Sequence, residues 1–136
     1  MVTTQDELFV ELGRFSKRWV AHGWSWDGRL DCVASTFSHA HLEEARSLVE
    51  DVFPERWTDS TLMDASSVVS AVASATGGVR SDQLLYSAPP LNGIVLYGLW
   101  WPWGAGGTSI SMRIGLTGHP SPAQMMQLRT AFGATD

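Results

Sequence analysis

The chain has 136 residues, of which 44% are hydrophobic and 17% are charged, and its formal net charge is −5. This length and composition are typical of one globular domain, residues 1–136, which buries roughly two thirds of its unfolded surface. The acidic balance argues against nucleic-acid binding, which needs a basic footprint, and the longest apolar run, near residues 94–103, is shorter than the ~20 residues that span a bilayer.

Cysteine usage and the N-terminal residues bear on the compartment. The single cysteine, Cys32, excludes an internal disulfide and fits a reducing environment. The first residues lack the basic-then-apolar order of a secretory signal. We therefore expect a cytoplasmic protein with no membrane partner.

The charges are distributed unevenly along the chain. Residues 1–68 contain 6 Lys/Arg and 12 Asp/Glu, a net of −6, whereas residues 69–136 contain 3 and 2, a net of +1. No charged residue occurs between Gln83 and Met112. The acidic half would complement a basic protein partner.

Two amphipathic helices are predicted in the first half. Thr4 and Glu7 have the spacing of a capping box, and the helix that follows carries an apolar stripe formed by Leu8, Leu12, Phe15 and Trp19. The second helix covers about residues 40–52 and has an acidic outer face formed by Glu43, Glu44, Glu50 and Asp51. Between the two helices, Asp27-Gly28 predicts a tight hairpin turn.

Residues 55–60 are predicted to form a loop. A third helix follows at about residues 62–76, with serines and almost no charge on its outer face. Such a face is a weak helix former in water, so another surface could cover it. A short strand is expected at residues 84–87.

The stretch from residue 92 to residue 117 predicts a central hairpin. Its first arm, residues 94–101, is apolar at nearly every position, so both faces of that strand must be covered. Its second arm alternates, with Ile110, Met112, Ile114 and Leu116 on one side. Ser121 to Gln124 form another capping box, with proline at the first helical position, and open a last helix that ends near Gly133.

These elements predict an α+β fold, with an antiparallel sheet of four to five strands and helices packed on it. Their order is helix, hairpin, helix, twice, so residues 4–54 and 60–133 are candidate internal repeats. At an offset of 80 residues His39 aligns with His119, Leu30 with Ile110, and Cys32 with Met112.

No motif carries recognisable chemistry. His39 and His41 are two residues apart and Glu43 follows, but the chain lacks both the later cysteine pair of the zinc deaminases and a His-Glu-x-x-His motif. Cys32 lies in an apolar strand, where cysteine usually acts as a small core residue. We predict no catalytic residue, no cofactor and no metal.

Four of the seven tryptophans lie at hairpin ends: Trp24, Trp26, Trp101 and Trp103. A Trp-x-Trp pair in a strand places both rings on one face. The two rings either plug the end of the sheet or form a binding hot spot.

These observations favour a small, non-enzymatic, bacterial-type protein that binds another protein. The specific hypothesis is an inhibitor or immunity-type protein that masks a basic toxin or effector. The residues predicted to contact the partner are Glu43, Glu44, Glu50, Asp51, Trp101 and Trp103.

Two alternatives remain open. One is a small-molecule-binding or catalytic α+β domain with a pocket near Arg113, a lone charge on an alternating strand that would hold an anion. The other is a homodimeric structural module that buries the uncharged residues 83–112 and the serine-rich helix face between two copies.

Overall fold

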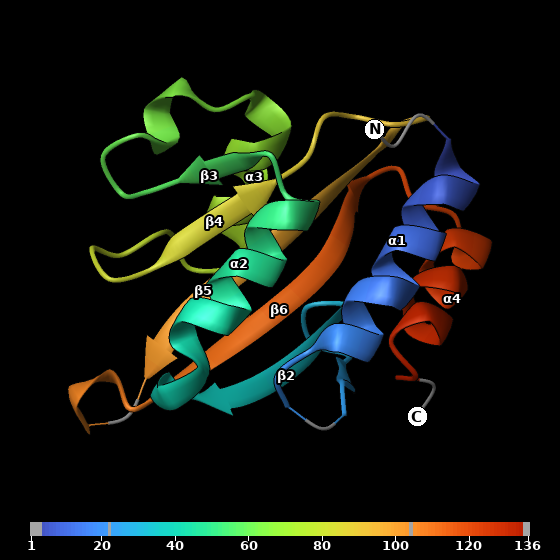
Figure 1. Cartoon of the computed structure of the whole chain (residues 1–136). Helices are drawn as coiled ribbons and strands as arrows, with labels where there is room; N and C mark the ends of the chain where they lie inside the picture. The colour runs from blue at the N-terminus through green and yellow to red at the C-terminus, as the bar shows by residue number, and fades with distance from the viewer. Residues whose placement is uncertain (1–3, 22, 104, 135–136) are drawn as a thin grey trace.

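The computed structural model describes residues 4–21, 23–103 and 105–134. These residues form a six-stranded antiparallel sheet with helices packed on it, in the strand order β1-β2-β6-β5-β4-β3 (Figure 1). The predicted α+β class is confirmed, and the sheet has more strands than the four to five expected.

The elements follow one another along the chain with short connections. The α-helices are α1 (Gln5–Arg18), α2 (Leu42–Val52), α3 (Ser67–Ala75) and α4 (Pro122–Ala131). The strands are β1 (Ser25–Asp27), β2 (Cys32–Ser38), β3 (Glu55–Trp57), β4 (Leu84–Ser87), β5 (Ile94–Trp103) and β6 (Ser109–Gly118). Three 3-10 turns connect them: η1 (His39–His41), η2 (Leu62–Asp64) and η3 (Ala105–Gly107).

The central hairpin is the pair β5 and β6. The two strands pair over ten positions, from Ile94 opposite Gly118 to Trp103 opposite Ser109. Every residue of β5 from Ile94 to Trp100 is buried, as its apolar sequence predicts for a strand covered on both faces. The alternation predicted for β6 is confirmed, because its four even-numbered apolar residues lie in the larger hydrophobic core.

That larger core lies between the sheet and three helices, α1, α2 and α4. It is rich in aromatic contacts, such as the ring pairs of Phe15 with Trp19 and of Phe37 with Trp100. The indole Nε1 of Trp19 donates a hydrogen bond to Ser35 Oγ at 2.9 Å, so its polar atom is satisfied inside the core. Figure 1 shows α1 and α2 in front of the sheet, with α4 beside α1.

A smaller core occupies the other face of the sheet. There α3 packs Val69, Val72 and Ala73 against alternate residues of β4 and β5, including Leu85 and Leu99. In Figure 1 this helix lies behind the strands. The two faces of β4 and β5 are therefore covered by different helices.

Capping residues set the helix ends. The Thr4 hydroxyl accepts a hydrogen bond from the Glu7 amide, and Ser121 and Gln124 form the predicted capping box, with Pro122 in the first turn. The third helix begins later than predicted, because the Ser66 hydroxyl accepts from the Val69 amide and caps α3 there. Residues 62–64 form the separate turn η2 instead.

The hairpin predicted around Asp27-Gly28 is confirmed by the pairing of β1 with β2, but its tight two-residue turn and the loop at residues 55–57 are wrong. The turn after β1 is a four-residue loop, residues 28–31, because the Asp27 carboxylate accepts the amides of Arg29 and Leu30 and Asp31 adopts a φ of 54°. Residues 55–57, predicted as loop, form β3, which pairs with β4. Three residues are too few to show an alternating pattern.

The internal repeat is not confirmed. Leu30 lies in the β1–β2 turn, whereas Ile110 lies within β6. Cys32 pairs with Gly115 and lies on the face away from α1, whereas Met112 faces α1. The two residues aligned by the repeat therefore lie on opposite faces, as after a shift in strand register by one residue. The first helices of the two units, α1 and α3, also cover opposite faces of the sheet.

The uncharged residues 83–112 form the middle of the sheet. Their large side chains, among them Tyr86, Leu99 and Trp100, are buried within this one chain. Most of the apolar surface expected at a homodimer interface is therefore not available to a second copy.

The tryptophans of β5 are expected to differ in their effect on stability. Trp100 is 2% exposed and packs against Phe37 and Tyr86, whereas Trp103 is 54% exposed. Trp100→Ala should lower the free energy of unfolding by about 3–5 kcal/mol, and Trp103→Ala by less than about 1 kcal/mol. Urea unfolding of the two variants measures the difference, and equal losses would contradict the assignment of Trp103 to the surface.

Candidate functional site

The two histidines and the cysteine that are candidates for metal binding or catalysis do not form a site. His39 and His41 are exposed in η1, and the described residues contain no group of three His, Cys, Asp or Glu side chains that could hold a metal ion. Cys32 is completely buried, and this burial raises the pKa of its thiol to about 11. The thiol therefore stays protonated and acts as a small core group.

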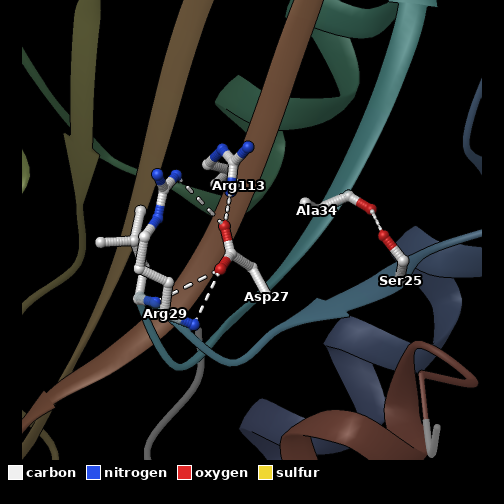
Figure 2. Close-up of polar contacts among 6 residues, drawn as sticks. Ser25, Asp27, Arg29, Ala34 and Arg113 are labelled. Carbon is white, nitrogen blue, oxygen red and sulfur yellow. Dashed lines mark hydrogen bonds and ion pairs between the residues drawn. The ribbon is translucent and has the colours of Figure 1, made fainter.

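Arg113 is paired rather than free. It projects from β6 on the face away from α1, and its guanidinium forms an ion pair with Asp27 of β1 (Figure 2). The Asp27 carboxylate also accepts the Arg29 amide at 2.9 Å. Burial alone would raise the pKa of Asp27, but the Arg29 amide and the Arg113 guanidinium together hold it below the ordinary value.

The surroundings of this pair do not favour the predicted anion site. The Arg113 guanidinium lies 5.2 Å from the centre of the Trp101 ring, and its charge is neutralised by Asp27. Next to it is a shallow hollow of about 430 Å³, lined mainly by small and hydroxyl side chains such as Ser25, Thr36 and Ser111. An incoming anion would have to compete with a carboxylate already in place.

The four acidic residues predicted on α2 lie at its two ends. Glu43 and Glu44 are exposed in the first turn, and Glu50 and Asp51 are exposed in the last. Since eight residues of helix rise roughly 12 Å, the two pairs are well separated. Glu50 accepts hydrogen bonds from Arg56 at 3.2 Å and from the Tyr86 hydroxyl at 3.3 Å, so it has a structural role.

Trp101 and Trp103 lie on the other face of the sheet. Trp100 packs beneath Arg46 of α2, and successive residues of a strand point in opposite directions. Trp101 accordingly packs beside the smaller core that contains α3. The six predicted contact residues thus divide between two faces and do not form one continuous surface.

A second concave surface lies between α1 and α2. It is a groove of about 820 Å³ that runs between the N-terminal half of α1 and the C-terminal end of α2, over the start of β5. Its apolar lining consists of Leu8, Val10, Val52, Pro54, Ala88, Pro89, Pro90, Leu91, Ile94 and Leu96. Its charged lining consists of Asp6, Glu7, Glu11, Asp51 and Arg14.

This groove has an acidic edge. Four carboxylates against one guanidinium give the lining a net charge of −3. Arg14 is paired with Glu11 at 3.0 Å, which uses the single positive charge. Among the predicted contact residues only Asp51 lines the groove. The sequence analysis did not predict the residues of α1 that line it. Its one sequence signal is Val10, an apolar residue that lies outside the core stripe of α1 and is 54% exposed.

No protein-family model matches the chain, and no curated protein and no solved structure gives a significant match. Among the residues that the structure describes, no helix has both the length and the apolar character needed to cross a membrane. The function is therefore inferred from the surfaces of this chain alone.

The Asp27–Arg113 pair should be measurable as a pH-dependent contribution to stability. Asp27→Asn keeps an acceptor for the turn amides but removes the charge, so we expect a loss of about 1–2 kcal/mol in unfolding free energy near neutral pH. Because folding lowers the pKa of Asp27, this contribution is complete above the ordinary carboxyl pKa and disappears as the pH falls through the folded-state pKa. Urea unfolding as a function of pH measures it.

Asp31→Asn is the matched control, since Asn tolerates the positive φ of this exposed turn position. We expect it to change stability by less than about 0.5 kcal/mol. An Asp27→Asn loss that stays constant down to the acid range would show that the ion pair is not its origin.

Proposed function

We propose that the chain is a non-enzymatic protein-binding module of the inhibitor or immunity type, which masks a basic toxin or effector with the surface formed by α1 and α2. The observation that carries the proposal is the apolar groove between these helices, with its net charge of −3. Apolar area supplies affinity, and charges around it select the partner and speed association.

The acidic residues of α2 extend this surface beyond the groove. Glu43 and Glu44 lie on the same helix as Asp51 and are exposed. A partner with a basic surface longer than the groove would contact both ends of α2. Trp103, on the other side of the sheet, is then a separate contact that only a partner wrapping around the end of β5 can reach.

Charge substitution on α2 tests the proposal. Affinity capture with chemical cross-linking from the native host should enrich a basic protein, and a variant with Glu43→Lys, Glu44→Lys and Asp51→Lys should lose it. Glu50 is left intact because it accepts the Arg56 and Tyr86 hydrogen bonds. With the purified partner, the variant should associate about tenfold or more slowly and with a weaker salt dependence.

The control carries one charge reversal at a distance from this surface. Asp82 is exposed in the loop before β4, at the end of the sheet opposite to the groove, so Asp82→Lys should leave capture unchanged. The captured protein should also lose its own activity when one equivalent of this chain is added. Capture that survives the α2 reversal but is lost with Trp103→Ala would place the binding surface at the end of β5 instead.

A further inference from the structure

Resting on the proposed function, we infer that the α1–α2 groove receives a basic amphipathic helix of the partner, whose apolar side chains enter the groove while its Lys or Arg residues meet the acidic edge.

Several polar backbone atoms at the floor of the groove are paired within the chain. Leu91 and Ile94 exchange hydrogen bonds of 2.8 and 3.1 Å, and the Ala88 amide donates to Leu96 O at 3.1 Å. On this edge β5 pairs with β4 only from Tyr97 to Trp100, and the segment of residues 88–91 lies beside its first residues through these hydrogen bonds. An occupant that added a strand would have to displace the segment of residues 88–91, so binding through side chains is favoured.

The apolar lining is preformed and of limited size. The rings of Pro89 and Pro90 fix the φ angles of these two residues, and Ile94 and Leu96 belong to the larger core. A volume of about 820 Å³ is within the roughly 300–1,000 Å³ of sites that enclose a small ligand. It accommodates a few anchoring side chains, as one face of an amphipathic helix provides, with the helix itself lying above the groove.

The charge of the edge determines the sign of the occupant. Asp51 lies in the last turn of α2, where the helix dipole disfavours a carboxylate, and it forms no ion pair within the described residues. A carboxylate that is disfavoured by its own helix dipole and has no internal ion pair is suited to an external cation. A second copy of this chain would bring a second acidic edge, so it is disfavoured as the occupant.

Designed peptides test the inference without the native partner. Three fluorescein-labelled peptides of about 18 residues, long enough to form an isolated helix, share one spacing pattern. The first combines Leu with Lys, the second Leu with Glu, and the third Ser with Lys. Fluorescence anisotropy should show that the Leu/Lys peptide binds at least about tenfold more tightly than either of the others.

Single substitutions localise the binding. Val10→Gln removes an exposed apolar contact from the groove, and Asp51→Lys reverses a charge at its edge. Each should weaken the Leu/Lys peptide by about threefold to tenfold, with Asp82→Lys as the control that changes nothing. Because Lys suits the C-terminal turn of α2, Asp51→Lys should keep or raise the melting temperature, which separates lost binding from lost folding.

The outcomes are distinct from those of the proposed function. Methyl chemical-shift changes at Val10, Val52 and Leu91 on adding the Leu/Lys peptide support the inference. Equal binding of the Leu/Glu peptide, or shift changes confined to Trp103 and its neighbours, overturn it. If the peptide occupies the groove while capture of the native partner ignores Asp51→Lys, the groove preference stands and the proposed use of the α1–α2 surface fails.

Discussion

The pairing of β5 with β6 is the interaction on which the rest of the structure depends. Ten residue pairs join the two strands, and β5 is buried on both faces over most of its length. Each face needs its own cover, so the larger core with α1, α2 and α4 forms on one side and α3 packs on the other. The sheet then extends outward from this hairpin, to β2 and β1 on one edge and to β4 and β3 on the other.

The same arrangement determines which surfaces remain open. At the start of β5, the beginning of α1 and the end of α2 border a groove, and the acidic first half of the chain supplies its edge. On the opposite face, Arg113 and Asp27 neutralise each other beside Trp101. The sheet thus presents an acidic, apolar groove on one side and a neutral, hydroxyl-rich hollow on the other.

Periodicity could predict the features that one segment determines by itself. The hairpin around β5 and the helices α1 and α2 each bury one stripe or a continuous apolar run, and that pattern is visible in the sequence, whereas α4 is indicated by its capping box. Features that join distant segments were missed. Asp27 and Arg113 are 86 residues apart, and the groove exists only because folding brings Asp6 close to Asp51. The strand β3 was missed for a different reason, since its pairing with β4 outweighs a sequence without alternation.

Hydrogen–deuterium exchange of the captured complex tests the central claim, that the α1–α2 groove is the contact surface, most directly. Compared with the free chain, the complex should show slower exchange in residues 6–14, 50–54 and 88–96. A bound segment covers the first part of α1, the end of α2, and the loop that leads into β5. Exchange in residues 101–109 should be the same in the complex as in the free chain. Protection confined to residues 101–109 or to β1 and β2, with the groove exchanging as in the free chain, would contradict it.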